Sequence, residues 1–385
     1  MPEILARKTV LLAKIQPTPT TDSIPTGAAN AILTSGLTMP DMQSTLVKRN
    51  LDRPTLGGEP QVHFGVHNDI SFGVEIAGAG VAGVAPNYGP LLRACGRAEI
   101  ILAAPEADTA QAGAASSITL AVGASTVDDA YQYLQIRTLT GTGAGQTAYC
   151  KSYIGTTKVL EIFGTWDTNP DATTTYSIDA QVAYVPVSTG FEMLSLYPSV
   201  DGQRHPMTDV RGNFSMKFAT AENAMFNFTM KGLWVDPTSV ADPVPDWSCF
   251  AEPLAVGNGN GTFKLHGAAY NMSSLDLDLG NQFPYRNVVG QEAVRITDRD
   301  STGSLVIDAP DLATKNFFTT AKANTLGAIE KIHGIAPGNT VVAYTPFAQL
   351  LQPKYGNADD LSTLEMGLAI TPSDAGNDEM IIIVK

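Results

Sequence analysis

Side chains that could bind a metal ion or a phosphate group occur at three places in this sequence, and each place lacks part of the required pattern. Residues 141–146 are glycine-rich but lack the Gly-Lys-Ser/Thr ending of a phosphate-binding loop, so they favour a hairpin turn between two strands. A calcium loop could begin at Asp298, but Ala309 occupies the twelfth position, where such loops carry a glutamate. His63 and His67 are four residues apart without a nearby Cys or third His, which disfavours zinc. We therefore predict no catalytic residue, no metal site and no cofactor, and we expect that the protein is not an enzyme.

Carboxylates in a strand-like pattern are the most distinctive polar feature. Asp276 and Asp278 alternate with three leucines in residues 275–279, and Glu75 alternates with apolar residues in 72–76. Because successive side chains of a strand point to opposite faces, the two aspartates lie on one face and the leucines on the other. One interpretation is an acidic strip that repels phosphate groups, and the other is an ordinary solvated face.

The overall charge limits the partners that the protein can have. The 385-residue chain has 38 acidic and 24 basic residues, which gives a formal net charge of −14. Such a surface repels nucleic acid over most of its area, so tight phosphate binding is not expected, although DNA could slide past it. Charged residues make up only 16% of the chain and apolar residues 44%, which predicts a folded protein with further surface buried between subunits.

Cysteine usage and the N-terminal residues indicate where the protein is made. Cys95, Cys150 and Cys249 are an odd number without CxxC spacing, which favours free thiols in a reducing compartment such as the cytoplasm. Residues 1–14 contain only a short apolar stretch, and no later segment has the roughly 18 uninterrupted apolar residues that cross a bilayer. We therefore expect neither a signal peptide nor a membrane span.

Alternation of apolar and polar residues predicts a mainly β chain. The alternation is clearest in residues 214–218, 226–230, 275–279 and 364–370. Helical spacing is rare and predicts one short helix within residues 88–95 and another within residues 312–324.

An internal duplication is the most informative feature of the chain. Five segments of the first copy recur in the same order in the second, namely 37–39, 48–50, 70–76, 91–92 and 230–237 against 275–277, 285–287, 301–307, 317–318 and 365–372. The number of residues that separates matched positions in the sequence is large for Ile76 and Ile307 and much smaller for Gly232 and Gly367. The first copy must therefore contain an insertion between these two positions. We expect a first domain of residues 1–106 and 186–250, an inserted small β domain of residues 107–185, and a second domain of residues 251–385.

Six segments resemble the major tail tube proteins of long-tailed bacteriophages of the siphovirus type. They are TGAANAIL at 26–33, NLDRPTLG at 50–57, APNYGPLLRACG at 85–96, LDLGNQ at 277–282, YRNVVG at 285–290 and ITDR at 296–299. The resemblance spans most of residues 1–106 and 186–385, and residues 127–146 are similar to a small β module that recurs in phage virion proteins. It implies two tandem tube domains, each a β-sandwich or barrel with a flanking α-helix, whose inner sheets join into one closed ring.

The resemblance also implies a function, partners and a location. The chain would be a structural virion protein that self-assembles into stacked rings, with DNA passing through the channel during ejection without specific binding. Single-domain relatives form rings of six chains, so a two-domain chain would need three. Its partners would be further copies of itself, the tape measure protein, the tail terminator and distal tail proteins, with no membrane contact. We expect assembly in the bacterial host cytoplasm and a final location in the tail of the virion.

Two sets of residues are candidates for this function. The candidates for an acidic channel lining are Asp276, Asp278 and Glu75. The candidates for contacts between rings or subunits, chosen because arginine and aromatic anchors are common at interfaces, are Arg49, Arg53, Tyr285 and Arg286.

A second function remains open at this point. The chain could be a phage decoration or spike protein whose β domains bind a surface ligand. Tyr131, Tyr133 and Trp166 in the insertion would favour this alternative if they formed an exposed aromatic patch.

Overall fold

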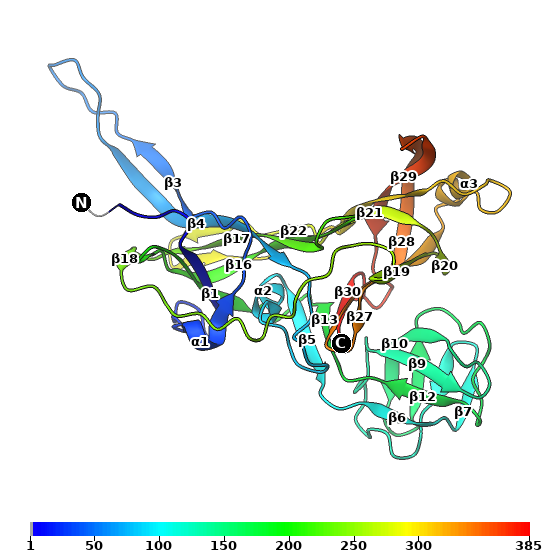
Figure 1. The fold of residues 1–385 in the computed structure, drawn as a ribbon. Helices are drawn as coiled ribbons and strands as arrows, with labels where there is room; N and C mark the ends of the chain where they lie inside the picture. The colour runs from blue at the N-terminus through cyan, green and yellow to red at the C-terminus, as the bar shows by residue number, and fades with distance from the viewer. Residues whose placement is uncertain (1–2) are drawn as a thin grey trace.

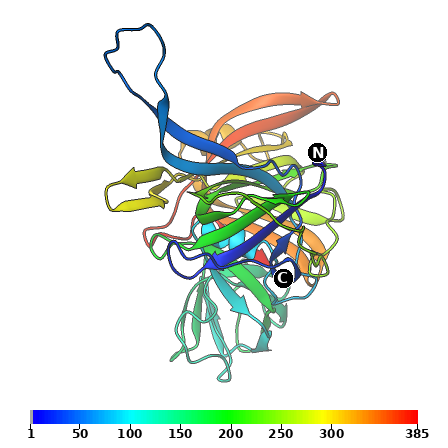
Figure 2. The same cartoon turned by 90° about the vertical axis from the view of Figure 1, so that its left-hand side faces the viewer.

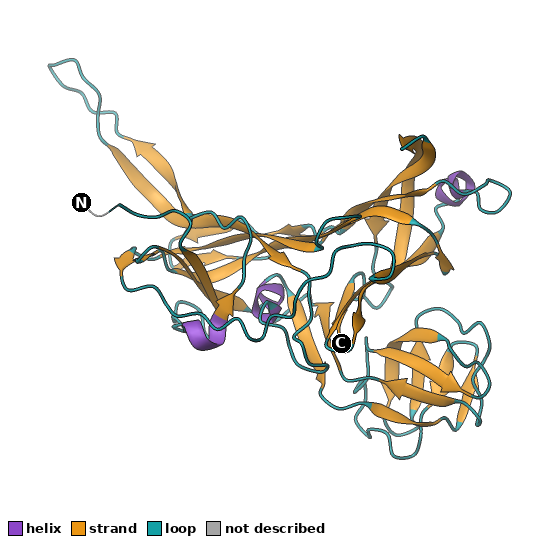
Figure 3. Cartoon of the chain, viewed as in Figure 1, coloured by secondary structure: helices purple, strands orange, loops and turns teal. Residues whose placement is uncertain are grey.

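The chain is built almost entirely of strands, as the alternating sequence pattern predicts. A computed structural model describes residues 3–385, and within them only three short helices occur: α1 (Gly27–Asn30), α2 (Gly89–Ala94) and α3 (Phe317–Lys322) (Figure 3). Three of the four segments with the clearest alternation lie wholly in strands and the fourth, 275–279, extends one residue beyond a strand that ends at Asp278, while α2 and α3 lie within the two segments with helical spacing.

The strands of residues 3–385 form one large sheet, one smaller sheet and two short hairpin-like pairs. The large sheet contains β1 (Thr9–Gln16), β2 (Ala31–Ile32), β3 (Asp41–Lys48), β4 (Gln61–Glu75), β5 (Arg97–Leu102), β13 (Gln181–Pro186), β14 (Met193–Val200), β15 (Gln203–Arg204), β16 (Met207–Ala219), β17 (Met225–Trp234), β18 (Thr238–Ser239), β19 (Gly261–Leu265), β20 (Ala268–Ala269), β21 (Met272–Asp278), β26 (Thr302–Asp308), β27 (Leu326–Ala336), β28 (Asn339–Ala358), β29 (Leu361–Ile370) and β30 (Ile381–Val384). The short pairs are β22 (Asn281–Gln282) with β25 (Asp298–Arg299) and β23 (Tyr285–Val288) with β24 (Gln291–Val294).

Two runs of five antiparallel strands have the same neighbour order. The first is β4, β17, β16, β14 and β1, and the second is β26, β29, β28, β27 and β19. A short helix follows the first strand of each run, α2 after β4 and α3 after β26. The two runs are joined edge to edge by β21, which pairs with β16 on one side and β26 on the other.

The pairing corrects one residue-level match between the two runs. The sequence comparison set Leu233 against Leu368. Its match of Ile76 with Ile307 sets Phe72 against Gly303, and the cross-strand partner of Gly303 is Leu368 whereas that of Phe72 is Phe228. Phe228 therefore corresponds to Leu368, five residues from the predicted position. A shared Gly-Leu pair misled the comparison because both strands carry alternating apolar residues.

One face of the large sheet is buried across both runs. The side chains of Val74, Phe226, Met216, Leu277 and Leu368 lie in neighbouring strands, point to the same side and are at most 1% exposed. They belong to a single apolar core that also contains residues of α2 and α3. Because burying each large apolar side chain stabilises a fold by about 1.5–3 kcal/mol, this continuous core fixes the two runs against each other.

The smaller sheet is an insertion in a hairpin of the large sheet. Its strands are β6 (Glu106–Thr109), β7 (Ala112–Ala114), β8 (Ser117–Thr119), β9 (Gln135–Thr140), β10 (Thr147–Ile154), β11 (Val159–Ile162) and β12 (Thr175–Ile178). Figure 1 shows this unit at the lower right, below the large sheet. The chain leaves at Leu102 and returns at Gln181, which pair directly, so the insertion leaves the surrounding sheet intact. The expected insertion of residues 107–185 includes most of β13, which instead pairs within the large sheet.

Candidate functional surfaces

The face of the large sheet opposite the core is a continuous surface of mostly small and polar side chains, with Met225 and Leu351 as large apolar exceptions. Direct cross-strand partners form one row across seven strands, which consists of Glu75, Met225, Lys217, Asp276, Ser304, Gly367 and Leu351. The next row consists of Gly73, Asn227, Ser215, Asp278, Thr302, Ala369 and Gln349. No arginine occurs in either row. We call this surface the polar face.

All three predicted acidic candidates lie on the polar face. Asp276 stands directly opposite Lys217 and Ser304, and partial burial raises the pKa of its carboxyl group. Glu75 accepts a hydrogen bond from the Asn223 side chain at 2.9 Å. Asp276 and Glu75 therefore contribute charge to this surface from two different strands.

Asp278 stabilises the turn at the end of β21. Its Oδ1 accepts hydrogen bonds from the backbone N–H of Gly280 at 2.8 Å and from Nδ2 of Asn213 at 2.7 Å. Gly280 has a φ of +70°, and a Cβ there would lie 1.9 Å from the carbonyl oxygen of Asp300. Asp278 thus stabilises a tight turn that only glycine accommodates.

An exposed hairpin arm projects from the first run. It consists of β3, the outer half of β4 and the connecting residues 49–60, and Figures 1 and 2 show it extending well beyond the sheet. Large apolar side chains are exposed along its whole length, namely Met42, Leu46, Val47, Leu51, Leu56, Val62 and Phe64. Phe64 is 52% exposed and Leu46 is 49% exposed. Large apolar side chains exposed in this number are typical of surfaces that contact another protein.

The arm carries two of the predicted contact residues. Arg49 and Arg53 lie in the connecting loop, and Arg53 forms an ion pair with Glu59 at 2.7 Å. The sequence pattern does not predict the exposed apolar side chains of the arm, because they occur on both faces of the hairpin. Adjacent exposed residues such as Leu46 and Val47 give no period-two signal, and only an apolar run lacking a polar face could have indicated them.

The other two predicted contact residues lie on β23. Tyr285 stacks on His67 with ring centroids 4.1 Å apart, and its hydroxyl donates a hydrogen bond to Glu292. Its ring is therefore engaged within the chain, where it braces the base of the arm. Arg286 is exposed on the same strand.

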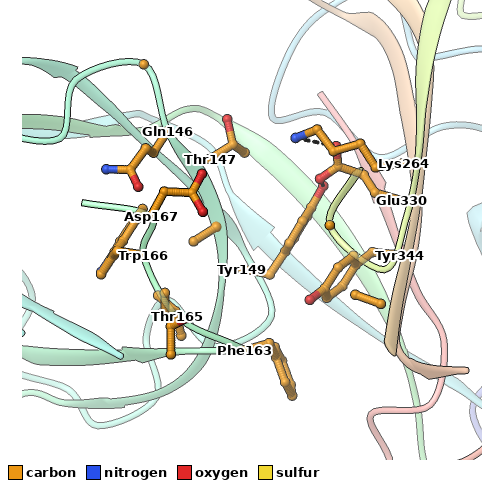
Figure 4. Close-up of a pocket in the computed structure, with 15 residues that line it drawn as sticks. Gln146, Thr147, Tyr149, Phe163, Thr165, Trp166, Asp167, Lys264, Glu330 and Tyr344 are labelled. Atoms are coloured by element: carbon orange, nitrogen blue, oxygen red, sulfur yellow. Dashed lines mark hydrogen bonds and ion pairs between the residues drawn. The ribbon is translucent and has the colours of Figure 1, made fainter. Parts of the chain in front are cut away.

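The insertion is docked firmly on the second run. Tyr149 of β10 stacks on Tyr344 of β28 at 3.8 Å, and its hydroxyl donates to Oε2 of Glu330 at 2.8 Å. Lys264 forms an ion pair with the same carboxylate at 3.4 Å. Figure 4 shows these side chains on one wall of a cavity of about 270 Å³, opposite Gln146 and Asp167 of the insertion. The aromatic residues of the junction belong to one apolar core that both units share.

The residues that would support a surface-binding alternative are not on the surface. Tyr131 is 4% exposed and Trp166 is 6% exposed, and both belong to the core of the insertion. Tyr133 is partly buried and stacks on Phe163. These three residues therefore form no exposed aromatic patch.

The remaining sequence motifs have structural surroundings. Residues 141–146 connect β9 and β10, which pair as an antiparallel hairpin, as predicted. Asp298 lies in β25, and the segment that follows it enters β26 instead of wrapping a calcium loop. His63 hydrogen-bonds Ser44 at 2.7 Å, and no group of three or more potential metal ligands gathers anywhere in residues 3–385.

Comparison of the chain with known protein families finds no match, and a search of characterised proteins finds no relative. Within residues 3–385, none of the helices has the length and apolar character needed to cross a membrane.

Proposed function

We propose that this chain is a structural virion protein, the major subunit of a phage tail tube, in which the polar face lines a channel for DNA. The observation that carries the proposal is the polar face itself, whose two rows cross seven strands without an arginine. The wall of a channel for DNA must be hydrated and must make no strong contacts with phosphate groups, because each basic contact slows the passage of a polyanion.

The charges on this face fit such a channel. In its two rows and the adjoining row through Glu365 and Lys354, the charged residues are Glu75, Asp276, Asp278, Glu365, Lys217 and Lys354. Lys217 pairs with Glu222 at 2.7 Å and Lys354 pairs with Glu365 at 2.7 Å, so both lysines are neutralised by neighbours. The resulting field is weakly negative and repels phosphate groups.

The strand order supports the proposed domain scheme. The two runs would be two tandem tube domains, residues 1–106 with 186–250 and residues 251–385, with the insertion on one of them. Three chains would then supply six equivalent runs to a pseudo-hexameric ring. The apolar arm would contact the neighbouring ring of a stack, since its exposed leucines, valines and phenylalanine need a partner surface.

Electron microscopy of the concentrated full-length protein tests the proposal. We expect hollow tubes or stacked rings with three chains per ring. Discrete monomers at every concentration would refute the tube, and six chains per ring would refute the trimer.

A pair of matched variants tests the role of the arm in the same assay. Replacing Leu51 and Leu56 by Asp removes two exposed apolar contacts, each worth about 1.5–3 kcal/mol once buried. We expect the critical concentration for tube formation to rise at least tenfold, since about 1.4 kcal/mol corresponds to a factor of ten. Val122→Asp alters an equally exposed apolar residue of the insertion and should leave tube formation unchanged. Normal tubes from the arm variant would exclude the arm from stacking.

A further inference from the structure

We propose that two copies of this chain join through one antiparallel ladder, in which the free edge of β28 in one copy pairs with residues 33–39 of the next copy. The inference rests on the proposed tube function, and it adds the strands and the residue register of the contact between chains.

The chain contains a template for this contact. β16 pairs with β17 along one edge, and its other edge pairs first with β14 and then with β21. The segment from Ser215 to Ala219 is thus covered by β21, which flanks β26. This internal joint connects the third strand of the first run, through β21, to the first strand of the second run.

β28 is the corresponding third strand of the second run, but one of its edges is incompletely paired. β29 covers one edge as far as Ala358, and β27 covers the other edge only as far as Gln349. In residues 3–385, no strand pairs with the second edge of residues 350–358. An uncovered edge of this length exposes unpaired N–H and C=O groups and is a template for another strand.

Residues 33–39 occupy the corresponding place at the beginning of the first run. Ser35 exchanges two backbone hydrogen bonds with Gly73, both 2.8 Å long, so this segment flanks β4 as β21 flanks β26. The outer edge of β21 is covered by β16, whereas the outer edge of residues 33–39 has no strand beside it in the described chain. Leu33 is 42% exposed at this edge. The two sides of the seven-strand polar face therefore present complementary unpaired edges.

The strand pairing fixes the register of the proposed joint. Lys217 pairs with Met225, and Lys354 pairs with Glu365, which corresponds to Met225 in the second run. Asp276 pairs with Ser304, and Ser35 pairs with Gly73, which corresponds to Ser304. Because Lys217 lies opposite Asp276, Lys354 of one copy should lie opposite Ser35 of the next.

Within one chain these two residues cannot meet. Ser35 and Lys354 are separated by seven strand-to-strand steps across the sheet, which amounts to roughly 34 Å at about 4.8 Å per step. Directly opposed residues in an antiparallel pair have Cα atoms about 4.5–5.5 Å apart, which is within the range that a disulfide bridges. A disulfide between these positions would therefore join different chains.

The experiment uses the full-length protein with Cys249, the exposed cysteine, replaced by Ser. The test variant carries Ser35→Cys and Lys354→Cys and is oxidised at the concentration at which assembly occurs, then separated on a non-reducing denaturing gel. We expect dimer and trimer bands that disappear on reduction. Ser35→Cys with Asn357→Cys is the register control, because its second cysteine is displaced by about 10 Å along the same edge. Lys217→Cys with Asp276→Cys is the internal control and should yield only a cross-linked monomer.

The outcomes separate this inference from the proposed function when the same samples are examined by electron microscopy. Tubes without the Ser35–Lys354 cross-link, or with equal cross-linking of the register control, would overturn the joint and leave the tube function standing. Specific cross-linking without tubes would support the joint and contradict the tube. Neither tubes nor cross-links would overturn both. A cross-linked ladder that ends at a number other than three would retain the joint and exclude the three-chain ring.

Discussion

Removing the Tyr149 hydroxyl should weaken the attachment of the insertion to the second run. This oxygen donates to Glu330 at 2.8 Å and accepts from Nε2 of Gln135 at 2.9 Å, and both Tyr149 and Glu330 are more than 90% buried. In Tyr149→Phe the buried carboxylate retains only the ion pair with Lys264 at 3.4 Å. A hydrogen bond to a charged group contributes about 1.5–3 kcal/mol, so we expect a loss of unfolding free energy in that range.

Urea unfolding and hydrogen exchange of β10 and β27 provide the measurement. The urea midpoint should fall without a change in slope, and exchange should accelerate on both sides of the junction if the insertion detaches first. Tyr133→Phe is the matched control, since it removes a tyrosine hydroxyl that forms no hydrogen bond in the described residues. We expect it to change stability by less than about 0.5 kcal/mol.

A double-mutant cycle with Glu330→Gln isolates the interaction. If the hydroxyl and the carboxylate act together, the two single effects should fail to add by more than about 0.5 kcal/mol. Additive effects, or a Tyr149→Phe variant as stable as the Tyr133→Phe control, would refute the assignment of this contact as the attachment point.

Three further variants test the polar face and the core. Asp278→Ala should lose about 1–3 kcal/mol because it leaves the N–H of Gly280 and the amide of Asn213 without their acceptor. Asp276→Asn should leave stability at pH 7 unchanged or slightly higher, because burial raises the pKa of that carboxyl group and the ionised form is the disfavoured one. If Asp278→Ala and Asp276→Asn lost the same unfolding free energy in a thermal unfolding assay, this difference between the two aspartates would be contradicted. At His333, burial and then the charge of Lys331 lower the pKa to about 4, so the neutral imidazole is favoured in the fold. Its contribution is complete above the ordinary pKa of about 6.5 and is lost as the pH falls from there towards 4. His333→Phe should therefore unfold at a lower pH than the parent chain, and an unchanged acid midpoint would exclude this histidine as a cause of acid sensitivity.

The sequence predicts the strands better than their alignment. Phe214, Met216 and Phe218 alternate with polar residues, and one such row suffices to identify a strand and its buried face. The same regularity hides the register, since every alternating strand can be shifted by two residues at little cost in pattern. The match of Gly232 with Gly367 has a different cause, since a displacement of five residues exchanges the two faces of a strand: the shared Gly-Leu pair was followed instead of the alternation.

The sequence predicts the polar face but not the arm, because only the polar face has an alternating pattern. Asp276 is visible as a polar residue between leucines, whereas the arm is defined by apolar residues that lack a core to face. Tyr285 illustrates another limit, because its ring contacts His67 from a segment more than 200 residues away. No local pattern encodes such a contact, and a conspicuous aromatic residue in a loop was therefore interpreted as available to another subunit.

The two kinds of joint in the proposed ring would differ in their electrostatics. Inside the chain, Lys217 faces Asp276, so opposite charges and a covalent connection both favour the pairing of β16 with β21. Between chains, Lys354 would face the uncharged Ser35, and its own ion pair lies with Glu365 on the neighbouring strand. Association between chains would then depend on backbone pairing and apolar contacts such as Leu33, which salt screens little. Assembly at 50 mM and 500 mM salt should therefore have the same critical concentration within about threefold, whereas a joint held by exchanged ion pairs would weaken markedly as the salt concentration rises.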